Sequence, residues 1–256
     1  MRLIDAHIHL DQYGRDEIKS ITSCPDTAAL ITVSTNLPSC KRNLELARNF
    51  PKVKPAFGFH PEQKLPEDKE LEELIKWMEA HREEMIAVGE VGLPYYLGKE
   101  QTIDKQPYIE LLEHFIKLAK KWEKPIALHA VYEDAPAVCA LLEKHSVEKA
   151  HFHWFKGDGK TIERMISNRF FISVPPEVVY KEKIKKIVQQ YPLGLMMGET
   201  DGPWPFEGPF AGKMTRPAMM KNSIKAIAHI KNLPEQEVAE TIFRNTIYFY
   251  GIRDGI

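Results

Sequence analysis

The chain has 256 residues, of which 43% are hydrophobic and 28% are charged, and its formal net charge at pH 7 is -1. This composition is that of an ordinary folded protein, and it argues against collagen-like and intrinsically disordered classes. The near-neutral charge argues against a strongly basic protein that wraps nucleic acid. A nuclease is still compatible with it, because bound cations can supply the positive charge that phosphate requires.

The three cysteines are Cys24, Cys40 and Cys139. They are odd in number and widely spaced, which favours reduced thiols over a disulfide framework or a zinc knuckle. The chain reaches Asp5 without an apolar secretory segment, and no apolar run is long enough to cross a bilayer. We therefore expect a cytoplasmic protein with no membrane partner, and no feature indicates an obligate protein partner.

Eight short apolar runs alternate with longer segments of helical periodicity. The runs are mostly uninterrupted, as expected for parallel strands that are covered on both faces. The clearest helical stripe runs from Tyr108 to Trp122, with apolar residues every three to four positions. We expect strands at residues 3–7, 30–34, 53–59, 85–88, 125–128, 150–152, 169–174 and 194–197.

About eight strands, each with a following helix, match the length and rhythm of an α/β (β/α)8 TIM barrel. We expect residues 1–256 to form one such domain, with its active site at the C-terminal ends of the strands. A doubly wound open sheet has the same rhythm and is the structural alternative. Residues 202–217 are rich in Pro and Gly, and we expect them to form a long loop over the barrel mouth.

His7 and His9 lie at the end of the first predicted strand. Residues two apart in a strand face the same side, so both imidazoles can point at one metal ion. A surface strand that carries two histidines would show the same pattern.

Four more candidate ligands lie at or after the ends of predicted strands, namely Glu90, His129, His153 and Asp201. Taken singly, each also fits an ordinary turn or a buried histidine, and His151 shares strand parity with His153. Together, four imidazoles and two carboxylates exceed what one zinc ion needs. They suit two divalent cations that share a carboxylate. The residue types are compatible with Zn, Ni, Mg or Mn.

Several stretches, in order, resemble the TatD-related metal-dependent hydrolases, the TatD DNases, among the amidohydrolase-type barrels. The resemblance covers essentially the whole chain. The stretches are DAHIHL at 5–10, GFHP at 58–61, GEVGL at 89–93, PIALH at 125–129, HWFKG at 153–157, ETDGP at 199–203 and the region 244–251.

The resemblance implies six metal ligands, which are His7, His9, Glu90, His129, His153 and Asp201. The first two histidines and Asp201 would hold one cation, the last two histidines the other, and Glu90 would bridge them. His60 would contact the substrate. The implied reaction is hydrolysis of DNA phosphodiester bonds by metal-activated water, with Glu90 and Asp201 as the catalytic carboxylates.

The chain departs from the family pattern at two places. Pro94 follows Leu93 where the family commonly has Asp, and Ala130 and Val131 follow His129 where it commonly has an Arg nearby. An Arg there would grip a phosphate with its bidentate fork, so its loss weakens the assignment to DNA.

Other residues on the predicted loops at this end could compensate. Lys156, Lys213 and Arg216 could supply positive charge, or they could be ordinary solvated charges. Five aromatic residues could stack on bases, line a pocket for a small substrate or pack the loops: Tyr95, Tyr96, Trp154, Trp204 and Phe206.

Two other functions compete with a DNase. The same cations could act as Lewis acids on an amide, ester or lactone, including a D-aminoacyl ester on tRNA, so the substrate could be a small molecule. A binding or scaffold protein could keep the barrel without turnover, although the full ligand set argues against it. DNA binding should weaken steeply as salt rises, whereas hydrolysis of a small ester should not.

Overall fold

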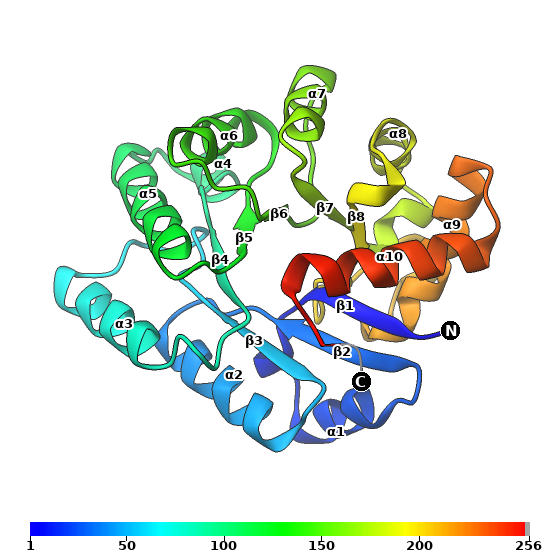
Figure 1. The fold of residues 1–256 in the computed structure, drawn as a ribbon, viewed down its shortest axis with the longest axis horizontal. Coiled ribbons are helices and arrows are strands. Elements are labelled where there is room, and N and C mark those ends of the chain that lie inside the picture. The colour runs from blue at the N-terminus through cyan, green and yellow to red at the C-terminus, as the bar shows by residue number, and fades with distance from the viewer. Residues whose placement is uncertain (254–256) are drawn as a thin grey trace.

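The computed structural model describes residues 1–253, in which eight parallel strands form a ring with helices on the outside (Figure 1). Each strand pairs with the next along the chain. The strands are almost entirely buried, which explains why they read as continuous apolar runs. They are β1 (Leu3–Ile8), β2 (Thr27–Thr32), β3 (Val53–Phe57), β4 (Ala87–Gly92), β5 (Ile126–His129), β6 (Ala150–Phe152), β7 (Phe171–Val174) and β8 (Met196–Gly198).

Two backbone hydrogen bonds join β1 to the residues that follow β8. The amide of Asp201 donates to the carbonyl of His7 at 2.9 Å, and the amide of His9 donates to the carbonyl of Gly202 at 2.8 Å. The edge strands of a doubly wound open sheet do not meet in this way. The structure therefore has the expected (β/α)8 barrel and not the open-sheet alternative.

All eight expected strands are present, with ends that differ by a few residues from the prediction. The largest shifts are at β2, which begins at Thr27, and at β4, which continues to Gly92. Glu90 therefore lies inside a strand and not in the turn after it.

The helices cover the outside of the barrel (Figure 1). The stripe predicted from Tyr108 to Trp122 lies on α5, with its buried face toward the strands. All three cysteines are free thiols. The helices are α1 (Arg15–Ser23), α2 (Leu37–Asn49), α3 (Asp68–Ala80), α4 (Leu97–Glu100), α5 (Gln106–Lys121), α6 (Ala135–Lys144), α7 (Gly159–Ser167), α8 (Glu182–Gln190), α9 (Met220–Lys231) and α10 (Glu235–Tyr250). Within residues 1–253, none of them is both long and apolar enough to cross a membrane.

The C-terminal helix α10 packs across β1 and β8 (Figure 1), and its last aromatic residues reach the barrel interior. The ring of Phe249 packs on Phe171 with centroids 5.0 Å apart. The hydroxyl of Tyr250 lies 2.7 Å from Nδ1 of His151 and 3.3 Å from the carbonyl of Ala6. The helix therefore completes the core and does not merely cover it.

We expect Phe249→Ala to lower the free energy of unfolding by about 3–5 kcal/mol, because it leaves a cavity where a fully packed ring lies. Phe249 is 1% exposed, whereas its neighbour Tyr248 is 70% exposed. Tyr248→Ala is therefore a matched control and should change stability by no more than about 0.5 kcal/mol. Chemical denaturation of both variants measures this, and equal losses would contradict the packing described.

Candidate metal centre

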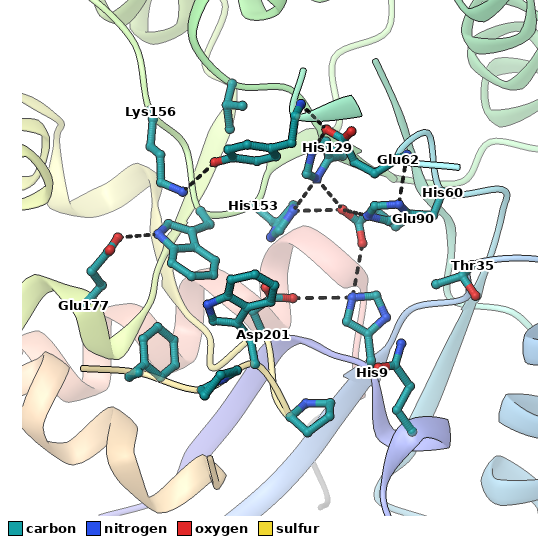
Figure 2. Close-up of a pocket in the computed structure, with 18 of the residues that line it drawn as sticks. His9, Thr35, His60, Glu62, Glu90, His129, His153, Lys156, Glu177 and Asp201 are labelled. Atoms are coloured by element: carbon teal, nitrogen blue, oxygen red, sulfur yellow. Dashed lines mark hydrogen bonds and ion pairs between the residues drawn. The ribbon is translucent and has the colours of Figure 1, made fainter. Parts of the chain in front are cut away.

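The six expected ligands come from five strands and meet at the carboxyl ends of those strands. All of them except His7 line one cavity (Figure 2). His7 is the last but one residue of β1 with His9 just beyond the strand, Glu90 lies in β4 and His129 ends β5. The remaining two, His153 and Asp201, follow β6 and β8 within three residues. All except His9 are buried. This is the end of the barrel where enzymes of this fold place their active sites.

The carboxylate of Glu90 lies at the centre of the cluster, and its two oxygens face different groups. Oε2 is 3.1 Å from Nε2 of His7 and 3.4 Å from Nε2 of His9. Oε1 is 2.8 Å from Nε2 of His153 and 3.1 Å from Nδ1 of His129. One carboxylate is thus shared between two sets of imidazoles.

Asp201 completes the set on the His7 side. Its Oδ1 is 3.4 Å from Nε2 of His7 and 3.4 Å from Nε2 of His9. Buried Nε2 of His7, Oε2 of Glu90 and Oδ1 of Asp201 have no hydrogen-bond partner among the described residues. Converging buried polar atoms without partners are rare in folded proteins, and nitrogen and carboxylate oxygen together suit a divalent cation. The donor set therefore fits a metal ion.

His129 is oriented by Glu62, a residue that the sequence motifs did not single out. Oε1 of Glu62 is 3.0 Å from Nε2 of His129, and the same carboxylate accepts the amides of Tyr96 at 2.8 Å and Leu97 at 2.6 Å. A proton on Nε2 leaves the lone pair of Nδ1 directed at Glu90. Such outer carboxylates fix the tautomer of a ligand histidine.

Glu199 lies on the outer side of His153, at a distance longer than a hydrogen bond. Its Oε2 lies 3.6 Å from Nδ1 of His153, while Nε2 of that ring faces Glu90. Both oxygens of Glu199 already accept hydrogen bonds, from the amide of Trp154 at 2.8 Å and from the hydroxyl of Ser173 at 2.6 Å. Glu199 is therefore better suited to orient His153 than to hold a cation with His7 and His153, although the three side chains lie close together.

The structure separates His151 from His153, which strand parity alone left open. Both point into the barrel, but His151 lies away from the cavity, between Tyr250 and Ser173. Ser173 gives its hydroxyl proton to Glu199, so it accepts from Nε2 of His151 at 2.5 Å, and Nδ1 accepts from the Tyr250 hydroxyl. Burial holds the pKa of His151 well below its usual range, which keeps the ring neutral.

His60 faces the same cavity, with Nε2 3.4 Å from Oε1 of Glu90. Its Nδ1 accepts the amide of Glu62 at 3.1 Å, and burial lowers the pKa of the ring. The neutral ring therefore carries its proton on Nε2. Although His60, Glu90 and His129 cluster closely enough for a metal ion, this tautomer makes His60 a hydrogen-bond donor toward the cavity.

The protonation of the cluster depends on two opposing effects, burial of the side chains and the charge of the groups that face them. Burial lowers the pKa of each ligand imidazole, but the facing carboxylates prevail and raise it to about 9 in His7, His9, His129 and His153. Burial likewise raises the pKa of Glu90 and Asp201, yet the imidazoles hold both well below the usual range of a carboxyl. Without metal, the site is a network of charged pairs at neutral pH.

The cavity beside these residues has a volume of about 900 Å³. The loop of residues 202–217 borders it through Trp204 and Phe206, as expected for a loop over the barrel mouth. Lys213 and Arg216 do not line it. Lys213 donates a hydrogen bond to the carbonyl of Pro209, and Arg216 donates one to the hydroxyl of Ser20. Lys156 does line it (Figure 2), as do Tyr96 and Trp154.

Residues 4–251 of this sequence match the sequence model of a protein family described as TatD related DNase. The chain belongs to this family. A relative from Haemophilus influenzae, an uncharacterized metal-dependent hydrolase, is 39% identical over 250 residues, which span 97% of this chain and 99% of the relative. The human deoxyribonuclease TATDN3 is 26% identical over 97% of this chain and 94% of its own length.

A crystal structure of YjjV, a TatD homolog from Escherichia coli K12, superposes with a TM-score of 0.87 and 25% sequence identity. It covers 98% of this chain and 99% of YjjV. The family model, the relatives and the cluster of ligands together identify a metal-dependent hydrolase of the TatD-related family.

We expect metal affinity to rise with pH up to about 9, because a cation must displace protons from imidazoles whose pKa lies near that value. Because folding raises the pKa of these rings, their protonation stabilises the metal-free fold at neutral pH. This stabilisation is lost as the pH rises toward 9. Calorimetric titration with Zn²⁺ or Mn²⁺ at pH 7 and 9, in buffers of different ionisation enthalpy, measures the released protons. Equal affinity and no proton release would contradict the protonation described.

We expect Glu199→Gln to weaken metal binding by about 10–100-fold, because outer-shell partners of a ligand histidine typically contribute that much. Glu182→Gln is a control, since Glu182 lies on α8 and pairs with Lys185 away from the ligands. Competition with a chelating dye measures both variants. An unchanged affinity in Glu199→Gln would show that Glu199 does not support His153.

Proposed function

We propose that the chain hydrolyses phosphodiester bonds of DNA with two divalent cations. His7, His9 and Asp201 would hold one cation, and His129 and His153 the other. Glu90 would bridge them. The observation that carries this proposal is the division of the Glu90 carboxylate, in which each oxygen faces a separate set of ligand atoms. A pair of cations with a shared carboxylate suits in-line displacement at phosphorus.

When bound, such cations polarise the phosphoryl oxygens and acidify water. Asp201 is ionised at neutral pH, and its buried Oδ1 has no hydrogen-bond partner among residues 1–253. It can therefore accept the proton of the attacking water. His60 directs an Nε2 proton into the cavity and can donate it, as a hydrogen bond, to the oxygen on which negative charge develops.

The ligand set leaves the metal open. Imidazole nitrogens favour zinc or nickel, whereas the carboxylates also suit magnesium or manganese. Reconstitution of chelated protein with each ion in turn would identify those that support turnover.

The name of one relative supports DNA as the substrate, because human TATDN3 is named a deoxyribonuclease. One feature counts against it. The turn after β5, where the family commonly has an Arg, carries Ala130 and Val131, both buried, and Pro94 is buried as well. No cation from that turn reaches the cavity.

A second candidate is hydrolysis of an amide, ester or lactone, including a D-aminoacyl ester on tRNA. It is favoured by the apolar part of the cavity wall, where Trp154 packs against Trp204 and Phe206. Such a wall also suits a small apolar substrate, and the same cations can polarise a carbonyl group.

Chelated protein resupplied with Mg²⁺, Mn²⁺ or Zn²⁺ should cleave single-stranded DNA and bis(p-nitrophenyl) phosphate in preference to a panel of esters, amides and lactones. Asp201→Asn should lower the rate by about 10²–10⁴-fold, because it removes the proposed proton acceptor. Asp158→Asn, at the start of α7, serves as a control. Turnover of a carbonyl substrate with none of either phosphodiester would favour the second candidate.

A further inference from the structure

Lys156 lies in the loop between β6 and α7, where two aromatic rings enclose its ammonium group. Nζ is 4.1 Å from the ring centroid of Trp154 and 5.7 Å from that of Tyr96. It donates to the Tyr96 hydroxyl at 3.0 Å. Figure 2 shows Lys156 at the cavity wall. The backbone carbonyl of Lys156 also accepts the amide of Tyr132 at 2.5 Å, which fixes the loop. The lysine is therefore held in position at the edge of the metal centre.

The ammonium group of Lys156 has unused hydrogen-bonding capacity. It carries three N–H donors, of which Tyr96 takes one, and no carboxylate of the described residues lies within 4.0 Å. Lys181, the other lysine on the cavity, is paired with Glu207 at 3.2 Å. Lys156 is half-buried, and a cation held in place there without an anionic partner favours a bound anion.

Glu177 is the carboxylate with the strongest charge interaction with Lys156, but it does not pair with the ammonium group directly. Oε2 of Glu177 accepts the indole N–H of Trp154 at 2.7 Å. Asp201 and Glu199 act on the lysine only at longer range, and Tyr132 also faces it. Lys156 therefore has no direct carboxylate partner among the described residues, and its remaining N–H donors are available to an anionic group of the substrate.

Exposed aromatic faces lie on the same cavity. Trp204 is 57% exposed and Tyr96 is 40% exposed, although both are large apolar side chains. Such rings stack on unpaired bases of any sequence. The cavity volume of about 900 Å³ is in the range of pockets that hold ligands of nucleotide size.

We propose that Lys156 is a specificity-determining residue that binds the phosphate next to the one being cleaved, so that the substrate is a single-stranded oligonucleotide and not an isolated phosphodiester. This inference rests on the proposed function, because it assumes a phosphodiester at the metal centre. Tyr96 and Trp154 hold the lysine, and Trp204 with Tyr96 offers surfaces for the flanking base.

The test compares Lys156→Met with wild-type holoenzyme on two substrates. Methionine keeps an unbranched chain between the two rings but removes the charge. We expect the KM for a single-stranded DNA oligonucleotide to rise by roughly 10- to 100-fold, the range for loss of a charge-assisted hydrogen bond. The loss on bis(p-nitrophenyl) phosphate, which has no second phosphate, should be smaller by about tenfold or more. Lys156→Arg should recover most of the oligonucleotide affinity.

Lys213→Met is the matched control, because Lys213 is a lysine near the barrel mouth that does not line the cavity. It should leave both activities unchanged. A second measurement is binding of a fluorescent oligonucleotide to chelated protein over a range of salt concentrations. The salt slope should fall by about one in Lys156→Met, the change expected for one lost phosphate contact.

Equal effects of Lys156→Met on both substrates, or no effect on either, would overturn the inference while the proposed function stands. Failure of wild-type holoenzyme to cleave either substrate would overturn the proposed function instead. In that case the salt slope still decides the subsite: an unchanged slope in Lys156→Met would overturn the inference, and a reduced slope would support it.

Discussion

A carboxylate without exposed surface, that of Glu90, lies within 3.4 Å of five imidazole rings at the mouth of the barrel. A buried carboxylate is stable only when charge and hydrogen bonds compensate for lost hydration. Here the imidazoles do so and hold its pKa well below the usual range. On the outer side of two of the rings, Glu62 bonds to Nε2 of His129 and Glu199 lies 3.6 Å from Nδ1 of His153. The arrangement of the imidazoles around the site thus follows from the burial of the Glu90 carboxylate.

The closure of the barrel brings the candidate ligands His7, His9 and Asp201 together. Asp5 is buried in β1 and accepts the amide of Thr200 at 3.0 Å, a contact that spans 195 residues of sequence. The neighbouring backbone bonds bring Asp201 beside His7. On the other side, a buried chain of hydrogen bonds runs from Tyr250 on α10 through His151 and Ser173 to Glu199. The packing of α10, the last helix in the sequence, is therefore linked by hydrogen bonds to Glu199, which lies beside the candidate ligand His153.

Much of the fold and the convergence of the six candidate ligands could be predicted from sequence, because parallel strands in a barrel bring all their carboxyl ends to one face. The supporting residues could not. Glu62 lies in a loop, and the one sequence signal that could have pointed to it is its position two residues after His60. His151 in β6 and His153 just after it have the same strand parity, so only their depth within the barrel separates them. Likewise, only the tertiary structure shows that Lys156, and neither of the other two candidate cations, lines the cavity.

Anomalous diffraction from crystals of the chelated protein soaked in Mn²⁺ or Zn²⁺ tests the central claim, that Glu90 bridges two cations. The account predicts two peaks, one on each side of the Glu90 carboxylate. The first should contact His7, His9 and Asp201. The second should contact Nδ1 of His129 and Nε2 of His153. A single peak, or a peak bonded to Nε2 of His60, would contradict the ligand assignment and the tautomers on which it rests.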